Sequence, residues 1–416
     1  MTLPSAHPSR LPRSESRRSV ARSGLAAAGA LALSAPVALA APYALPAPVA
    51  WDSVNAAVNN TTLAATGTVG DRNYNVFDGF TTTIGLPIGN ATNAEYVDVL
   101  VLNGSTVTSS SVFVGDNANS LGNFSLVIDN ATLSATGTNN ANIRLGSKSS
   151  NNSLYIQNGG TLDVTGSHFN GNGNDGYVNN NIVVHGAGSQ FNSVQDLYVV
   201  YSGSTLGGTG SLSVENGGHV TIGAANDTTN RRLRIRHGYN SAITVTGATS
   251  KIDAYGTVTL GELTVATENN KLVLEDGGSL WIHNVTNQAA PLTWAKKSGG
   301  IDHQIDLGEG FLVVKGNQVN NTTITALIHA DNGSGYAAGV MGTATWNGAA
   351  FGFTSSGDPG NYYAFYVDGS AGQSFLVGGV DTAGYTVFTN FAVIPEPGVL
   401  ALVAVGSAMI VGRRRD

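Results

Sequence analysis

The sequence predicts an all-β protein built as a right-handed parallel β-helix, a β-solenoid with coils of roughly 29 residues. One observation is an alternating apolar block that recurs at steps of about 26 to 31 residues. Another is the Gly-containing or polar corner that follows each block. The third is a composition with 54 Gly and 11% charged residues, which favours strands and turns over helices. The blocks begin at Leu100, Leu126, Leu154, Ile182, Leu212, Ile243 and Leu272.

Each block reads as a strand, a tight corner and a second strand. In the block that begins at Leu154, Leu154 and Ile156 alternate with polar residues, so period two places them on one face. Asn158-Gly159-Gly160 then supplies the positive φ that a tight corner needs. A third short strand lies between most blocks, at residues 112–115, 143–146, 197–199, 233–235 and 258–260.

Three short strands in each step of just under 30 residues fit one coil of a parallel β-helix. A single coil cannot bury its apolar face, but stacked coils share a continuous core. A β-sandwich or a string of antiparallel hairpins is the alternative, because regular strand spacing alone also permits those folds.

The sequence divides into five predicted segments. After Ala290 the repeat gives way to an aromatic-rich stretch that is expected to close the end of the solenoid. The segments are a signal peptide (1–40), an N-terminal cap or irregular region (41–97), β-helix repeats (98–290), a C-terminal β cap (291–392) and a sorting signal with a hydrophobic helix (393–416).

Composition excludes several classes of function. The chain has no Cys, so thiol redox chemistry and disulfides are excluded. Without the eight basic and two acidic residues of the two ends, the net charge falls from −7 to about −13. Such an acidic body argues against nucleic-acid binding. A hydrophobic content of 42% argues against disorder for most of the chain.

The first 40 residues have the three parts of a secretory signal peptide. Five Arg lie between residues 10 and 22, and an apolar run from Leu25 to Leu39 follows. Ala38 and Ala40 supply small residues at positions −3 and −1, so signal peptidase is expected to cut before Ala41. A retained signal anchor and twin-arginine export remain alternatives.

The last 24 residues combine a turn, an apolar span and a basic end. Pro395-Glu396-Pro397 precedes the apolar span 399–411, and Arg413, Arg414 and Arg415 follow it. By the positive-inside rule the Arg cluster stays in the cytoplasm while the body faces outward. A span of about 13 residues is short for a permanent anchor, so transient membrane anchoring is expected.

This tail resembles the PEP-CTERM sorting signal of Gram-negative bacteria. The resemblance implies export across the inner membrane, processing by an exosortase-type membrane protease, and a place at the outer surface or in the extracellular matrix. It also implies an association with exopolysaccharide and biofilm formation. The repeats look like those of autotransporter adhesins, which is a looser resemblance than that of the tail.

One basic cluster stands out in the predicted solenoid. Leu233 and Ile235 are expected to point inward, which places Arg232, Arg234 and Arg236 on the outer face, roughly 7 Å apart. Such a row can grip the carboxylates or sulfates of an acidic polysaccharide. The alternative is a solvated strand face whose Arg side chains pair with nearby acids.

No cofactor is expected, and metal chemistry has one weak candidate. Asn172, Asn174 and Asp175 offer oxygen ligands on a Gly-rich turn, as calcium loops do, but no EF-hand Glu follows. A plain loop is the alternative.

The expected function is structural or adhesive, and a β-helix carbohydrate-active enzyme or a glycan-binding module is the alternative. Polysaccharide lyases and hydrolases need clustered carboxylates, whereas the acids of the repeats are scattered. Asp129, Glu215 and Glu275 follow the first strand of their blocks at one phase, so they are expected to share a spaced column. No Ser-His-Asp arrangement or nucleotide-binding loop is found.

Overall fold

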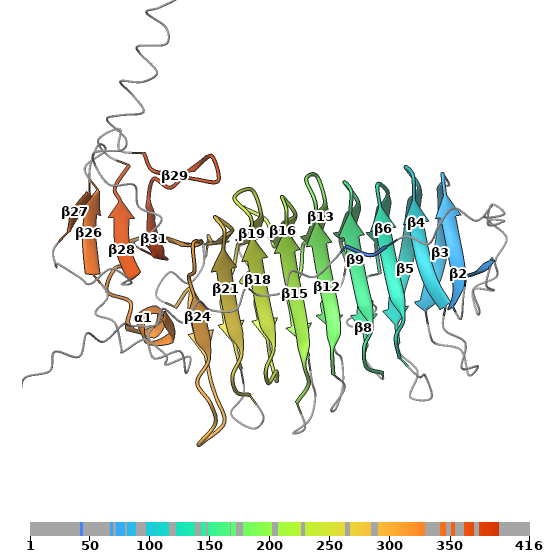
Figure 1. Cartoon of the computed structure of the whole chain (residues 1–416), viewed down its shortest axis with the longest axis horizontal. Coiled ribbons are helices and arrows are strands. Elements are labelled where there is room, and N and C mark those ends of the chain that lie inside the picture. Colours follow the sequence, from blue (N-terminus) through green and yellow to red (C-terminus); the bar gives the residue numbers. More distant parts are fainter. Residues whose placement is uncertain are drawn as a thin grey trace, which may run out of the picture. The chain divides into compact units, whose positions relative to one another are not determined.

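The computed structural model gives the fold of the repeats and of much of the segment that follows them (Figure 1). It describes residues 42–44, 67–69, 72–79, 81–88, 97–115, 122–137, 143–146, 149–166, 168–171, 178–201, 207–225, 229–262, 267–283, 290–328, 342–346, 351–353, 362–369 and 374–390.

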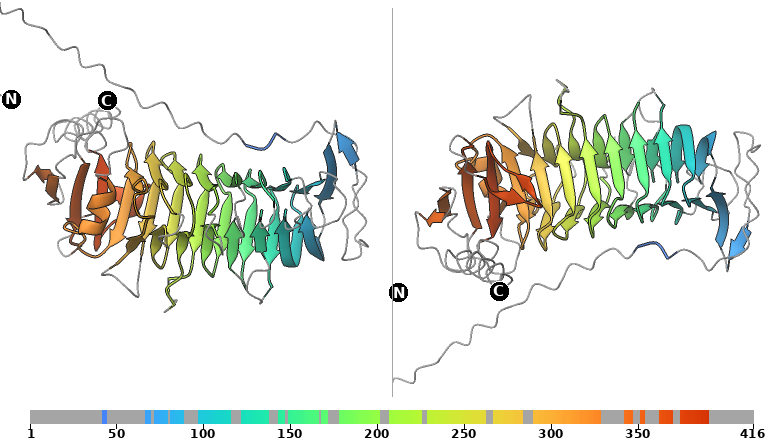
Figure 2. Two further views of the ribbon diagram at one scale, coloured as in Figure 1. Left: turned by 90° about the horizontal axis from the view of Figure 1, so that it is seen from below. Right: turned by 90° about the horizontal axis from the view of Figure 1, so that it is seen from above.

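The repeats form a parallel β-solenoid whose strands stack in three ladders (Figures 1 and 2). Every pair in the first ladder is parallel, except that β1 (Gly67–Val69) pairs antiparallel with β2. This ladder contains β2 (Arg72–Asp78), β4 (Val97–Leu102), β6 (Ser125–Asp129), β9 (Ser153–Gln157), β12 (Asn180–His185), β15 (Gly210–Glu215), β18 (Ala242–Thr246), β21 (Lys271–Glu275) and β24 (Gln304–Asp306).

The other two ladders share one 19-stranded sheet. The second ladder contains β3 (Thr81–Ile88), β5 (Thr106–Val114), β7 (Thr132–Ala135), β10 (Thr161–Val164), β13 (Gln190–Ser193), β16 (His219–Ile222), β19 (Lys251–Ala254), β22 (Ser279–Ile282) and β25 (Phe311–Lys315). The third contains the ends of β3 and β5 with β8 (Ile143–Leu145), β11 (Phe169–Gly171), β14 (Leu197–Val200), β17 (Leu233–Ile235), β20 (Val258–Leu260) and β23 (Leu292–Trp294).

The register follows the sequence repeat. Leu154 pairs with Leu126 and Ile182, and Leu212 pairs with Ile182 and Ile243, so equivalent residues of successive blocks are neighbours. The first step differs by one residue, because Leu126 pairs with Val99 and not with Leu100. Parallel pairing of the described repeat strands confirms the solenoid and excludes both a β-sandwich and a string of antiparallel hairpins.

Alternation places the apolar residues of all three ladders in one core. Leu154 and Ile156 of β9 are 1% and 0% exposed, and Leu233 and Ile235 of β17 are both fully buried. The corners use left-handed backbone, as the Asn-Gly pattern predicts: Asn158 has φ 53° and Gly159 has φ 83°. A side chain at Gly160 would collide with the carbonyl oxygen of Ile128 in the preceding coil, so the second Gly of this corner is required for close stacking.

Parallel stacking extends beyond both predicted limits of the repeats. On the N-terminal side, β2 and β3 already pair in parallel with β4 and β5. On the C-terminal side, β23, β24 and β25 pair in parallel with β20, β21 and β22. The expected boundaries at 98 and 290 therefore do not coincide with the ends of the stack.

The parallel stack of the second ladder ends at β25, where β31 (Tyr385–Asn390) pairs with it antiparallel. β28 (Tyr362–Val367) continues the sheet beyond β31. The remaining strands are β26 (Gly342–Trp346), β27 (Phe351–Phe353), β29 (Leu376–Val377) and β30 (Val380–Asp381).

One short helix, α1 (Thr322–Ile328), follows β25 and contributes Ile324, Leu327 and Ile328 to the main core. Asn321 caps this helix, because its side-chain oxygen accepts the N–H groups of Thr323 and Ile324.

Several predicted features lie outside the described residues. These are the signal peptide with Ala38, Ala40 and Ala41, the sorting tail with Pro395, Glu396, Pro397, Arg413, Arg414 and Arg415, and the calcium-loop candidates Asn172, Asn174 and Asp175. Within the described ranges, no helix is both long enough and apolar enough to cross a membrane.

Candidate functional site

The predicted Arg row lies on the outer side of the third ladder, around β17. Register aligns Tyr198 of β14, Arg234 of β17, Thr259 of β20 and Thr293 of β23 in one column across four coils. Leu233 and Ile235, which flank Arg234, are buried in the core as the alternation predicts.

Arg234 is the centre of a row of three charged side chains, Asp196, Arg234 and Glu262, which we call the charge ladder. Its side chain is 3% exposed, and its guanidinium lies 2.9 Å from Asp196 Oδ2 and 3.1 Å from Glu262 Oε2. It also stacks over the ring of Tyr198, 5.0 Å from the ring centroid. Asp196 belongs to the coil before Arg234 and Glu262 to the coil after it, so the three charges link three coils.

Tyr198 is part of this ladder and stays protonated. Its hydroxyl donates to Asp196 Oδ2 over 3.3 Å. Burial, followed by the negative charge of Asp196, raises the pKa of Tyr198 well above its usual value. The Tyr198 hydroxyl therefore acts as a hydrogen-bond donor and not as an anion.

The two flanking Arg side chains are held less tightly than Arg234. Arg236 lies 3.4 Å from Glu262 and stacks over Tyr201 at 5.1 Å, with 27% of its side chain exposed. The side chain of Arg232 approaches Asp196 through Nε alone, at 3.7 Å, and is 39% exposed. Of the three predicted glycan contacts, Arg232 is thus the most accessible and Arg234 the least.

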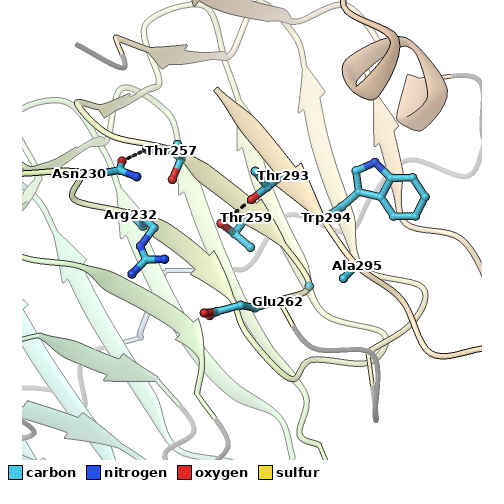
Figure 3. Close-up of a pocket in the computed structure, with 9 residues that line it drawn as sticks. Asn230, Arg232, Thr257, Thr259, Glu262, Thr293, Trp294 and Ala295 are labelled. Atoms are coloured by element: carbon cyan, nitrogen blue, oxygen red, sulfur yellow. Dashed lines mark hydrogen bonds between the residues drawn. The ribbon is translucent and has the colours of Figure 1, made fainter. Parts of the chain in front are cut away.

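A pocket of about 210 Å³ opens beside this ladder (Figure 3). Arg232 and Glu262 provide its charged groups, and the hydroxyl of Thr259 lies 3.1 Å from that of Thr293. Its lining consists of Asn230, Arg232, Thr257, Thr259, Gly261, Glu262, Thr293, Trp294 and Ala295. The residue types are those that bind hydroxyl groups and single charges.

Trp294 does not supply an aromatic floor for the pocket. Its indole is directed away from Thr259 and Thr293 in Figure 3, and it packs edge-on against His303. His303 accepts the N–H of Asn270 at Nδ1, so its Nε2 donates to the carbonyl oxygen of Ala295 over 2.8 Å. Burial lowers the pKa of His303, which keeps the ring neutral in this role.

A second polar cluster, which the sequence did not reveal, lies on the second ladder around Asp253 of β19. Asp253 Oδ2 accepts Nε2–H of His219 over 2.7 Å, and Oδ1 accepts Nε2–H of His283 over 2.8 Å. Lys251 lies 3.0 Å from Oδ1, and the hydroxyl of Tyr385 lies 2.8 Å from His283 Nδ1. We call His219, Lys251, Asp253, His283 and Tyr385 the Asp253 cluster.

The surroundings of the Asp253 cluster shift the pKa values of Asp253 and of two nearby Tyr side chains. Burial acts to raise the pKa of Asp253, but the hydrogen bonds from His219 and His283 and the charge of Lys251 outweigh it and hold the pKa well below its usual range. Burial, helped by the nearby Tyr255 and Asp253, raises the pKa of Tyr385 to about 12. Burial and Asp253 also raise the pKa of Tyr255, whose ring stacks on His283.

No protein-family model, curated protein or solved structure matches this chain.

The predicted column of acids forms as expected, but its members are spaced apart. Register connects Asp129, Gln157, His185, Glu215, Thr246 and Glu275 in that order. Adjacent strands lie about 4.8 Å apart, so Glu215 and Glu275 are separated by roughly 10 Å. Burial and the charges of Asp306 and Asp276 raise the pKa of Glu275.

In the described part of the chain, no group of three or more His, Cys, Asp or Glu side chains is arranged to hold a metal ion. The Asp253 cluster escaped the sequence analysis because the hydrogen bonds that join its His and Tyr side chains span 30, 34 and 102 residues. The register between coils is the signal that would have found it. Register pairs His219 with Lys251, and it pairs Asp253 with Trp281, two residues before His283.

Proposed function

We propose that this protein is an exported structural or adhesion protein of the bacterial surface or extracellular matrix, associated with exopolysaccharide. The observation that carries the proposal is the continuous parallel stack from β2 to β25 around one apolar core. A stack of this kind gives a stiff scaffold whose outer faces repeat at each coil.

The outer face of the second ladder supports a scaffold role. Its early coils present Thr106, Thr132, Thr161 and Gln190 in register, which are small or uncharged polar residues. The right-handed winding follows the general rule for parallel connections. The segment with α1, β28 and β31 acts as the C-terminal cap, because it supplies apolar residues to the core and an antiparallel end to the ladder.

In this proposal the leader directs export of the chain, and the tail anchors it and directs its processing. Signal peptidase removes residues 1–40, the span 399–411 holds the chain in the inner membrane transiently, and an exosortase-type protease processes the Pro395-Glu396-Pro397 tail. The apolar span and the Arg cluster support this proposal, because they are a short membrane segment with its positive end inside.

Cell fractionation tests the proposed route. We expect the full-length protein to reach the surface fraction, where protease added to intact cells degrades it. Deletion of residues 393–416 is expected to release the body into the soluble exported fractions, and replacement of Arg413, Arg414 and Arg415 by Ser to impair retention before processing. A Glu309→Gln variant in a β turn of the body is the control. Unchanged distribution after the tail deletion, or a cytoplasmic full-length protein, would contradict the proposal.

Carbohydrate cleavage is the second candidate, and the Asp253 cluster favours it. Asp253 binds Nε2–H of His219, which leaves Nδ1 of a neutral His219 as the basic atom. His219 is 39% exposed, and Lys251 is its direct neighbour in register. A base beside a cation is the pairing that β-elimination from a uronic acid requires.

An activity assay decides between the two candidates. A lyase releases unsaturated uronates, which are detected by ultraviolet absorbance after incubation with alginate or polygalacturonate. Product that disappears in a His219→Gln variant would support the second candidate. Absence of product at high protein concentration would support the structural one.

A further inference from the structure

Two half-exposed side chains at the pocket beside the charge ladder have binding atoms left over. Arg232 uses its backbone N–H and Nε toward Asp196, and its two terminal nitrogens have no partner among the described residues. Glu262 uses Oε2 for Arg234 and Arg236, while Oε1 has no side-chain partner in the same part of the chain. These two side chains therefore offer the pocket two donor nitrogens and one acceptor oxygen (Figure 3).

A donor and an acceptor that share one pocket suit a ligand that both donates and accepts hydrogen bonds. Vicinal hydroxyl groups of a sugar do both. The planar guanidinium of Arg232 can donate two parallel bonds, and the carboxylate of Glu262 accepts a charge-assisted bond from a hydroxyl group. The hydroxyls of Thr259 and Thr293 extend the same polar lining.

Charge favours a neutral sugar over an acidic one. Glu262 lines the pocket together with Arg232, so an anionic ligand that binds the guanidinium also meets a carboxylate in the same pocket. Arg234 and Arg236, which an acidic glycan would need, are already paired with Glu262 and Asp196. The body without its two ends also carries about −13 charges, which repels polyanions at long range.

We propose that this pocket binds a neutral hexose residue of an extracellular polysaccharide, with Arg232 and Glu262 clasping two adjacent hydroxyl groups. The inference rests on the proposed function, because an exported solenoid is the form that meets such a polysaccharide. With no aromatic stacking platform from Trp294, the site binds weakly, and the many identical sugar residues of one polysaccharide chain supply retention by raising the local ligand concentration.

Affinity electrophoresis of the purified protein tests the proposal directly. The gels contain dextran, laminarin or galactomannan as neutral probes, and alginate or polygalacturonate as acidic probes. We expect at least one neutral probe to retard the protein, and we expect the affinity to change little between low and high salt, because no ligand charge is screened. Localisation plays no part in this assay, so its failure and a failure of export are distinguishable.

Substitutions separate hydroxyl binding from anion binding. Arg232→Gln and Arg232→Lys are both expected to weaken retardation by about tenfold, since Lys keeps the charge but loses the planar fork. Glu262→Gln is expected to weaken binding of a neutral sugar, whereas it would strengthen binding of an acidic one. Thr259→Val, which removes a hydroxyl of the pocket lining, is also expected to weaken retardation, and Thr161→Val on β10 is its control. Thermal melting confirms that each variant is folded.

Three results would overturn the proposal. One is retardation by acidic probes alone, strengthened by Glu262→Gln. Another is retention by a neutral probe that Arg232→Gln and Arg232→Lys leave unchanged. The third is no retardation of the folded wild-type protein by any neutral probe.

Discussion

Two polar clusters on the outer face of the same sheet differ in the exposure of a central carboxylate, Asp253 in one and Glu262 in the other. Around Asp253, the carboxylate is 8% exposed and both of its oxygens are bonded. Its neighbour Trp281 is buried in a second core with Val313, Phe365 and Val387. Around the pocket, Arg232 and Glu262 are 39% and 28% exposed and keep binding atoms open.

The difference comes from what lies over each cluster. Tyr385 of β31 bonds His283, and the ring of Trp281 packs edge-on against Tyr385. Residues 374–381 approach the solenoid as well, since a side chain at Gly378 would contact the carbonyl oxygen of Ala248. The carboxylate of Asp253, which lies near β31, therefore joins strands of the fold. The more exposed carboxylate of Glu262 lines a pocket. The exposure of the carboxylate, more than the residue types around it, distinguishes the two clusters.

The largest expected effect is the loss of Arg234 from the charge ladder. Arg234→Ala leaves the carboxylates of Asp196 and Glu262 close together without their buried cation, and we expect a loss of about 3 to 5 kcal/mol in the free energy of unfolding. Urea denaturation measures it. Arg232→Ala, the matched control, is expected to cost less than about 1 kcal/mol because it breaks only a long, half-exposed pair. Equal losses would contradict the distinction between the two Arg residues.

Removing the carboxylate of Asp253 is expected to cost about 2 to 3 kcal/mol at neutral pH. Because the folded pKa lies below the unfolded value of about 3.9, this contribution is fully present above pH ~4 and is lost as the pH falls through the folded pKa. Asp253→Asn should therefore flatten the decline of wild-type stability in acid. Asp163→Asn, at an equivalent outward position on β10, is the control. Parallel acid profiles of wild type and Asp253→Asn would refute this account.

Tyr385 is expected to contribute less to the free energy of unfolding than Asp253, and its contribution is lost at alkaline pH. Its pKa is raised to about 12, so its contribution is complete below pH ~10, where unfolded Tyr begins to ionise, and is lost between pH ~10 and about 12. Tyr385→Phe is expected to cost about 1 kcal/mol at neutral pH and to weaken the alkaline decline. Tyr366→Phe is a matched control on β28. Denaturation at a series of alkaline pH values gives the comparison, and identical slopes for both variants would argue against a cross-link through Tyr385.

The sequence predicted the local features of the fold well. Alternation placed Leu233 and Ile235 in the core, and the Asn-Gly pattern identified corners such as Asn158. The sequence-based prediction failed where the register between coils, or pairing with strands later in the chain, determines the structure. The one-residue shift at Val99 and the parallel pairing of β23 to β25 carry no local signal.

The candidate sites depended even more on long-range packing. The Arg row was visible in the sequence, but the burial of Arg234 depends on Asp196 and Glu262 in neighbouring coils. The bond between His283 and Tyr385 spans 102 residues, so no spacing rule could have found it.

Carboxyl-group footprinting tests the contrast between the two clusters most directly. The purified protein is modified with a carbodiimide and a small amine at neutral pH, with and without the neutral polysaccharide that retards it, and the rates at Glu262 and Asp253 are measured by mass spectrometry. We expect faster modification of Glu262 than of Asp253 and protection of Glu262 alone by the polysaccharide. Equal rates at the two residues, or no protection of Glu262, would contradict this expectation.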